Sequence, residues 1–327
     1  DASEDYDIRV VERERQEKTM KSLSKSFIRF VIGSMFIIAA FLKLISIDAF
    51  EIYIYSFNIL NFVATTIASR LIIAGEMILG SFLIFNIYHK LTWHTTFIVE
   101  ILFTAFLIFT TLSRDDANCH CFGELIELSP IESIVKNAIT IALLFLIRND
   151  QERQCKTLLP IILCLISLIA TFVITPMDSI YKKIFSTAKN ISTIDLYDSL
   201  NEMMKIDFED DEITIDSTDF FTLNDGKQMM VVVSSGCKYC RLGVKKLSLI
   251  VKNNDIDKDN INIVIWGNNE GIIDFSEETE TRDYRYWLIN PHRAIDITYG
   301  HFPTIIWLED KNVVKAGDFR DIEEKSF

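Results

Sequence analysis

The sequence predicts a membrane bundle of α-helices, four helices plus a fifth linking helix, followed by an α/β domain. Hydrophobic residues make up 49% of the 327 residues, although the formal net charge is −13. The apolar residues gather in residues 27–175, whereas residues 177–327 hold 28 acidic and 18 basic side chains. The first part is therefore expected to lie in the lipid bilayer and the second part to face water. Neither part has a basic patch, which excludes nucleic acid as an expected partner.

Five apolar segments are candidates for membrane-spanning helices, because a span needs roughly 20 mostly apolar residues. They are residues 27–47, 67–88, 93–112, 131–147 and 157–175. The first four are expected to form a membrane domain over residues 27–147, and residues 148–176 a cytoplasmic loop with the fifth helix. The aromatic residues 50–62 are expected at the membrane interface. Residues 1–26 are polar and lack the apolar core of a cleavable signal, so the first span is expected to act as the targeting signal.

Basic residues predict the orientation of these helices, because short cytoplasmic loops are enriched in Lys and Arg. One side of the membrane would hold Lys18, Lys21, Lys25, Arg29, Lys90, Arg148, Arg153 and Lys156. The opposite side would hold none in residues 48–66 and only Arg114 in residues 113–130. We therefore expect an inner (cytoplasmic) membrane protein with a cytoplasmic N-terminus. Its residues 177–327 and its loop 118–123 would both lie on the periplasmic, or extracytoplasmic, side.

The last third of the chain alternates strand-like and helix-like segments. After an acidic linker over residues 177–212, we expect strands at 228–234 and 261–266, helices at 238–251 and 294–299, and a hairpin of 304–308 with 313–316. Asp318 could cap a final helix. Alternating strands and helices with a closing hairpin predict a small α/β sandwich over residues 213–327.

Cys237 and Cys240 form a CxxC motif where a β-branched strand meets a helix. Free N–H groups and the partial positive charge of a helix N-terminus favour a thiolate, which is the attacking species in disulfide exchange. The second cysteine can then resolve the mixed disulfide. The alternative is half of a zinc site, which would need two more ligands. Only the scattered His292 and His301 are present in this domain, so exchange is favoured and no metal is expected.

The segment from the strand before Cys237 to the residues after Pro303 resembles the thioredoxin superfamily. In that family a cis-proline precedes the fourth strand and lies against the CxxC, and Pro303 is the matching residue. The resemblance implies that Phe302 and Pro303 present backbone groups to a bound substrate chain. It also implies an insertion at about residues 267–290. The Trp usually found before the motif and the Pro usually found inside it are absent, which leaves the direction of electron flow open.

A second close pair lies in the sequence Cys119-His120-Cys121-Phe122-Gly123. With the helices around it, over residues 28–147, it resembles the MauE/DoxX-like membrane family. The matching residues include Gly33, Lys43, Phe50, Gly75, Glu76 and Gly80. The resemblance implies a role in making or isomerising disulfides of exported proteins. A disulfide between residues this close is strained, which suits a relay site. The alternatives are two free thiols, or a metal site that includes His120.

Charged residues inside apolar helices are costly and usually have a purpose. They are Lys43, Arg70, Glu76, Glu100 and Lys136. Glu76 is expected to pair with Lys43 from the neighbouring helix. Such a pair could simply fix helix packing, or Lys43, Glu76 and His120 could form a polar pocket for a quinone headgroup beside the CxC pair. Cys164 is expected to pack in the fifth helix, and Cys155 to be a reduced cytoplasmic thiol.

These observations lead to one principal hypothesis, a membrane-anchored thiol–disulfide oxidoreductase. Its layout parallels that of bacterial vitamin K epoxide reductase fusions. Cys237 and Cys240 would act on exported cysteine-containing clients, and Cys119 and Cys121 would relay electrons to or from a membrane carrier. No tightly bound cofactor is expected, and a membrane quinone is the candidate carrier. The alternative is a non-catalytic assembly or maturation factor that holds one exported client. The direction of electron flow, the client and the oligomeric state stay open.

Overall fold

The computed structural model divides the chain into two compact units, each of which is considered by itself. The first comprises Asp1–Glu51 and Thr66–Pro176, and the second comprises Ile52–Thr65 and Met177–Phe327. The structure describes residues 2–114, 118–126, 128–150, 158–178, 180–181, 191, 196, 200, 202–209, 212–222 and 225–324. Cys155, Arg153, Lys156 and much of the expected linker lie outside the described residues.

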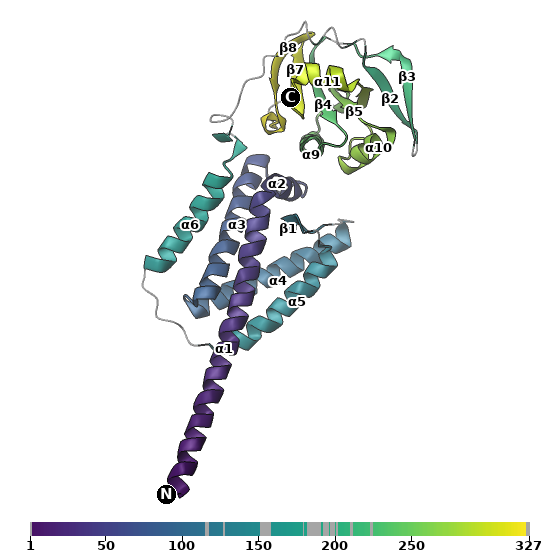
Figure 1. Ribbon diagram of the computed structural model, residues 1–327. Coiled ribbons are helices and arrows are strands. Elements are labelled where there is room, and N and C mark those ends of the chain that lie inside the picture. The colour runs from purple at the N-terminus through teal and green to yellow at the C-terminus, as the bar shows by residue number, and fades with distance from the viewer. Residues whose placement is uncertain are drawn as a thin grey trace. The chain divides into compact units, whose positions relative to one another are not determined.

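The helices of the membrane part follow the predicted order. They are α1 (Ala2–Ile45), α2 (Ile47–Tyr55), α3 (Phe62–Phe85), α4 (His89–Ser113), α5 (Pro130–Ile147) and α6 (Leu158–Ile174), with the short strand β1 (Cys121–Glu124) before α5 (Figure 1). Among the described residues, four stretches are long and apolar enough to cross a membrane: Ser22–Ile45, Phe62–Phe85, His89–Ser113 and Pro130–Ile147. The helix α6 is apolar but has 17 residues. The prediction of four long helices plus a further one is confirmed, and the chain is a multi-pass membrane protein.

Glycine lets α1 and α3 approach within backbone contact. A Cβ atom added to Gly33 would lie 2.6 Å from the carbonyl oxygen of Gly80, and one added to Gly80 would lie 2.6 Å from that of Gly33. Small residues commonly permit such contact between membrane helices, where close packing drives association.

At the start of α5, Ser129 and Glu132 form a capping box and Pro130 takes the first helical position.

The second unit is built on one mixed seven-stranded sheet. Its strands are β2 (Met204–Glu209), β3 (Glu212–Phe220), β4 (Lys227–Ser234), β5 (Ile261–Trp266), β6 (Arg285–Leu288), β7 (Thr304–Glu309) and β8 (Asn312–Gly317). They lie in the order β3-β2-β6-β5-β4-β7-β8. The central strands β4, β5 and β6 are parallel, and the outer pairs are antiparallel. The predicted mixed α/β domain is thus confirmed.

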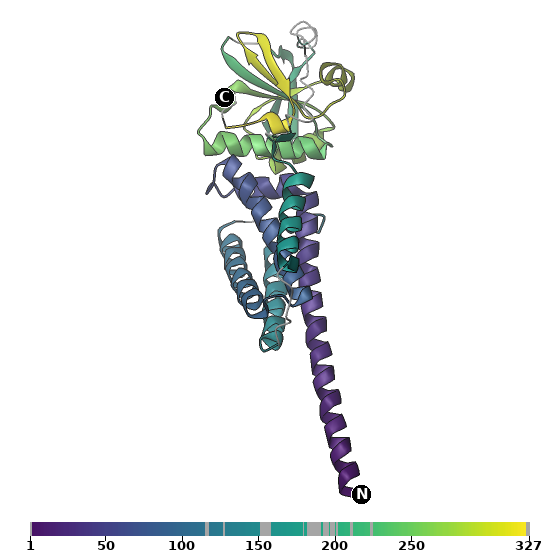
Figure 2. The same cartoon turned by 90° about the vertical axis from the view of Figure 1, so that its left-hand side faces the viewer.

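Helices cover both faces of this sheet. Val231 and Val233 of β4 belong to one core cluster with α9 (Lys238–Asn253), which Figure 2 shows as the long green helix across one side of the sheet. Met230 and Val232 belong to a second cluster with α11 (Pro291–Thr298). A strand covered on both faces is apolar throughout, which explains the continuous hydrophobic run before the CxxC.

The structure differs from the sequence prediction at three places in this domain. The sheet begins before residue 213, because β2 pairs with β3 and β6 inside the segment expected to be a linker. The segment 267–290, where an insertion was expected, forms α10 (Asn269–Glu278) and β6, so the expected insertion is a further helix and a further strand of the sheet. Asp318 caps only the 3₁₀ turn Phe319–Asp321, not a full helix.

The segment Ile52–Thr65 contributes to the core of the second unit. Tyr55 and Phe62 belong to the same hydrophobic cluster as the α9 residues. The Lys246 ammonium of α9 lies 4.0 Å from the centre of the Phe62 ring and 3.1 Å from a carboxylate oxygen of Asp178. Two of the aromatic residues expected at the membrane interface, Tyr55 and Phe62, therefore pack against protein in this structure.

Candidate functional site

The end of strand β4 delivers Cys237 to the start of helix α9. Cys237 is the N-cap residue of this helix, and its Sγ accepts a hydrogen bond from the backbone N–H of Cys240 at 3.2 Å. A thiol at this position takes the place of the Ser or Asp side chains that usually cap helices. The spacing of the CxxC motif therefore puts the first sulfur within reach of the backbone N–H of the second cysteine, which also donates to the Cys237 carbonyl oxygen at 3.1 Å.

The two cysteines of this pair have different environments. Cys240 is completely buried, whereas Cys237 is partly exposed. The hydrogen bond from the Cys240 side chain, helped by the N–H groups of Cys240 and Tyr239, lowers the pKa of Cys237 to about 6 although burial opposes it. Burial raises the pKa of Cys240 well above its usual range, and the bond to Cys237 adds to this. Cys237 can thus attack as a thiolate, whereas Cys240 is held protonated.

Phe302 and Pro303, predicted as substrate-binding residues, lie in the same region of the domain. The Phe302–Pro303 peptide bond is cis. Phe302 and Cys237 both pack against the core cluster that holds Cys240, and a Cβ atom on Gly243, one turn after Cys240, would lie 3.2 Å from Pro303 Cγ. The loop before β7 therefore packs against the first turns of the helix that carries the CxxC.

The second predicted pair, Cys119 and Cys121, is joined by a disulfide with 5.3 Å between the Cα atoms. Both residues are almost fully buried, among apolar side chains of α4, α5 and the loop. Gly123 has a φ of +67°, and a Cβ atom there would lie 2.2 Å from Ser46 Oγ and 2.8 Å from the Leu42 carbonyl oxygen. The glycine of the CxCFG sequence is therefore needed to seat this loop against the end of α1.

Ser133 also belongs to this site, although the sequence pattern did not predict it. Its Oγ lies 2.9 Å from Cys119 Sγ and 3.3 Å from Cys121 Sγ, and the residue is fully buried in the first turn of α5. The only available signal was its place one turn after the Ser129-Pro130 helix start. His120, between the two cysteines, donates its backbone N–H to Asn118 Oδ1 at 2.9 Å.

Buried charges lie inside the membrane unit. Lys43 of α1 forms an ion pair with Glu76 of α3, the pairing expected from the sequence. Glu100 interacts electrostatically with Lys136, Glu76 and Lys43. The Lys136 ammonium is 5.3 Å from the centre of the Phe122 ring, which belongs to the CxCFG loop. Two acidic and two basic side chains thus form a cluster of zero formal charge that reaches the loop with the second cysteine pair.

Arg70 does not join this cluster. It forms a buried ion pair with Glu51 of α2. Its guanidinium also donates to the carbonyl oxygens of Thr175, at 2.9 Å, and Pro176, at 3.2 Å, which follow α6. Arg70 therefore ties together the ends of α2, α3 and α6, and its contacts are those of a structural residue.

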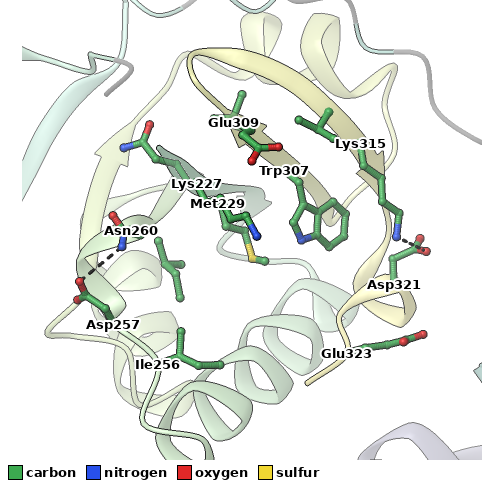
Figure 3. A pocket seen from close by; sticks show the side chains of 14 residues that line it. Lys227, Met229, Ile256, Asp257, Asn260, Trp307, Glu309, Lys315, Asp321 and Glu323 are labelled. Carbon is green, nitrogen blue, oxygen red and sulfur yellow. Dashed lines mark hydrogen bonds and ion pairs between the residues drawn. The ribbon is translucent and has the colours of Figure 1, made fainter. Parts of the chain in front are cut away.

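A cavity of about 550 Å³ lies at the other end of the sheet from Cys237. Figure 3 shows Met229 and Trp307 on its wall, with Lys315 turned towards Asp321 at the rim. The first residues of β4 line it, so it is separated from the CxxC by the length of an eight-residue strand, roughly 25 Å. It is therefore a separate feature from the thiol site. Within the described part of the chain, no group of three or more His, Cys, Asp or Glu side chains is arranged to hold a metal ion.

Comparison with known proteins places the membrane part in a family. Protein TlpB of Flavobacterium psychrophilum is 26% identical to this chain over 315 residues, which covers 84% of each protein. No solved structure was found to match the chain. Residues 21–148 match the family model of the methylamine utilisation protein MauE. The bundle that carries Lys43, Glu76 and the Cys119–Cys121 disulfide is therefore a MauE-family membrane domain.

Proposed function

We propose that this protein is a membrane-anchored thiol–disulfide oxidoreductase with a thioredoxin-like domain that acts on exported proteins. The observation that carries the proposal is the asymmetry of the CxxC pair. Cys237 is partly exposed with a lowered pKa, and Cys240 is buried with a raised pKa. The thioredoxin-like identity is supported by the order β4, CxxC, α9, β5, cis-Pro303, β7 and β8.

The chemistry follows from this asymmetry. When the pair is reduced, the Cys237 thiolate attacks a disulfide of the client, and one client sulfur leaves as a thiolate. Cys240 then loses its proton and attacks Cys237, which releases the second client sulfur. The client gains two electrons and two protons, and Cys237 and Cys240 become a disulfide. In the opposite direction the same steps, reversed, oxidise a client dithiol.

The second part of the proposal is that Cys119 and Cys121 exchange electrons with Cys237 and Cys240. It is supported by the presence of two close cysteine pairs in one chain and by the MauE-family character of the membrane domain. A shared chain raises the effective concentration of one pair at the other. The exchange also requires the predicted orientation, with the N-terminus in the cytoplasm and both pairs on the outer side of the inner membrane.

A membrane quinone is our proposed carrier for the Cys119–Cys121 pair. Reduction of a quinone takes up two electrons and two protons, the number that a dithiol releases on oxidation. The buried cluster of Lys43, Glu76, Glu100 and Lys136 supplies charged groups for a polar headgroup near the CxCFG loop. Purified reduced protein should reduce a short-chain quinone, and Glu76→Gln should slow this step without slowing reduction of the Cys237–Cys240 disulfide by dithiothreitol.

Thiol trapping in cells tests the proposed function. The redox states of both pairs are measured in the wild type, in Cys119→Ser and in Cys237→Ser, with Cys164→Ser as the matched control. Oxidised Cys237–Cys240 that becomes reduced in Cys119→Ser would identify a disulfide-forming enzyme. A reduced pair in the wild type would identify a reductase or isomerase. If Cys237→Ser keeps full activity and the same stoichiometric client complex, the protein is instead the non-catalytic maturation factor.

A further inference from the structure

The two sulfurs of the membrane disulfide receive different hydrogen bonds. Cys119 Sγ lies 2.9 Å from Ser133 Oγ and 3.3 Å from the backbone N–H of Cys121, which donates to it. Cys121 Sγ lies farther from the same hydroxyl, at 3.3 Å, and its other polar contact is the Cys119 carbonyl oxygen at 3.7 Å. Two hydrogen-bond donors thus converge on Cys119 Sγ, whereas the carbonyl oxygen near Cys121 Sγ is only an acceptor.

This difference predicts which sulfur can best carry a negative charge. The sulfurs of a disulfide have no proton, so the Ser133 hydroxyl can act towards them only as a donor. Hydrogen bonds to a charged acceptor are roughly twice as strong as those between neutral groups, so both donors gain strength when Cys119 becomes a thiolate. A carbonyl oxygen beside Cys121 would repel a thiolate there. Exposure does not separate the two, because Cys119 and Cys121 are 2% and 3% exposed.

We propose that Ser133 is a catalytic residue that makes Cys119 the leaving sulfur, so that an incoming thiolate bonds to Cys121. This inference rests on the proposed exchange function and refines it to single atoms. A better leaving thiolate speeds exchange, and the choice of the attacked sulfur follows from it. The mixed disulfide would therefore join Cys237 to Cys121, with Cys119 free as a thiolate.

The electrons and protons of the step balance without a further reagent. The Cys237 thiolate forms a bond to Cys121 Sγ, the Cys119–Cys121 bond breaks, and its electron pair goes to Cys119 Sγ. Cys240, after losing its proton, attacks Cys237, and Cys121 leaves as a thiolate. The two protons originally on Cys237 and Cys240 end on Cys119 and Cys121. One disulfide and one dithiol have exchanged their oxidation states.

The fold holds Ser133 in place for this role. The Ser129–Glu132 capping box fixes the start of α5, so that Ser133 follows in the first turn. The backbone N–H of Cys119 donates to the Leu128 carbonyl oxygen at 2.8 Å, which returns the loop to the same helix start. The hydroxyl and the two sulfurs are thus set by one short segment of chain.

A small thiol in place of Cys237 tests the choice of sulfur directly. The full-length Cys237→Ser/Cys240→Ser protein is treated briefly with 2-mercaptoethanol, and freed thiols are blocked with iodoacetamide. Fragment mass spectra of the peptide with Cys119 and Cys121 then show which residue carries each group. We expect the mercaptoethanol adduct on Cys121 to exceed that on Cys119 about tenfold, the lower limit for a hydrogen bond to a charged group.

Ser133→Ala in the same background should lower this ratio about tenfold, towards equal labelling. Thr140→Val is the matched control, because it removes a buried hydroxyl from the same helix two turns away. It should leave the ratio unchanged. An excess of adduct on Cys119, or an unchanged ratio in Ser133→Ala, overturns the proposal. If Ser133→Ala does not fold, the ratio of the two adducts in the protein that keeps Ser133 still tests the proposal. Since the probe replaces Cys237, the result does not depend on whether Cys237 is the natural partner, which thiol trapping decides.

Discussion

The rate at which Cys237 reacts with iodoacetamide tests the asymmetry on which the proposed function depends. The pKa of Cys237 is about 6 in the folded domain, whereas burial raises that of Cys240. In reduced protein, alkylation of the CxxC should therefore fall on Cys237. Its rate should rise with pH along a curve with a midpoint near pH 6, because only the thiolate reacts.

The size of the effect can be worked out at pH 6. About half of Cys237 is thiolate there, compared with about 0.3% of an ordinary thiol of pKa about 8.5, a gain of about 150-fold. A less basic thiolate is also a weaker nucleophile, and a Brønsted coefficient of about 0.45 over 2.5 units of pKa costs about tenfold. The larger thiolate population outweighs the loss of nucleophilicity, so Cys237 should react about tenfold faster than glutathione at this pH.

The Cys240→Ala substitution tests what lowers the pKa of Cys237. It removes the side-chain hydrogen bond that contributes most to the lowered pKa of Cys237 but leaves the backbone N–H groups in place. The midpoint should therefore rise by part of the difference between 6 and an ordinary thiol value. Cys164→Ala, which removes a thiol from α6, is the control and should leave the curve unchanged. A midpoint near pH 8.5 in the wild type, measured by mass spectrometry of the Cys237 peptide, would refute the reasoning.

Three further substitutions test the packing that holds the two sites. Gly243→Ala would bring a Cβ atom within 2.7 Å of Phe319 Cβ, so α9 must shift, and we expect a loss of about 1–3 kcal/mol in thermal unfolding. Gly123→Ala would place a Cβ 2.2 Å from Ser46 Oγ, just after α1, at a φ of +67°, so the loop should move and dithiothreitol should reduce its disulfide faster. Lys43→Met leaves the Glu76 carboxylate largely buried without its cation, and should cost about 3–5 kcal/mol in detergent, most of it recovered in Lys43→Met/Glu76→Leu.

The sequence predicted those parts of the fold that have a strong hydrophobic pattern. The long apolar helices, the buried strand before Cys237 and the closing hairpin after Pro303 are such parts. The strand Met204–Glu209 was missed because it lies near the sheet edge and is half charged, so that only Ile206 is fully buried. Its acidic residues resembled those of a linker. A strand that is buried on one side only is recognised by the alternation of apolar and polar residues, and six residues are too few to make this alternation clear.

The residues of the site could be predicted only where they lie close together in the sequence. CxxC and CxC predict close sulfurs because the chain itself brings them together. Ser133 is 14 residues from Cys119, and Glu51 pairs with Arg70 across two helices. Serine and glutamate are common residues, and nothing in their local sequence distinguishes these two. Their partners are determined by how the loop and the helices fold back, which a single sequence does not record.

The two cysteine pairs use the same local arrangement, and this has a consequence for the direction of exchange. In each pair the backbone N–H of the second cysteine donates to the first sulfur, at 3.2 Å for Cys237 and 3.3 Å for Cys119. The first sulfur is thus the stabilised thiolate in both pairs. In the proposed mixed disulfide between Cys237 and Cys121, either Cys119 or Cys240 can attack, and the sulfur released in the return step is again the stabilised Cys237 thiolate.

Exchange between the pairs should therefore pass through the same mixed disulfide in both directions, with the net flow set by the client and the membrane carrier. Purified protein prepared with only the Cys237–Cys240 disulfide, and protein prepared with only the Cys119–Cys121 disulfide, should relax to the same mixture. Acid quenching and alkylation followed by mass spectrometry measure this mixture. Relaxation from one starting state but not from the other would show that one pair lacks a competent thiolate. A reversible site of this kind oxidises clients when its carrier is oxidised and reduces them when its carrier is reduced.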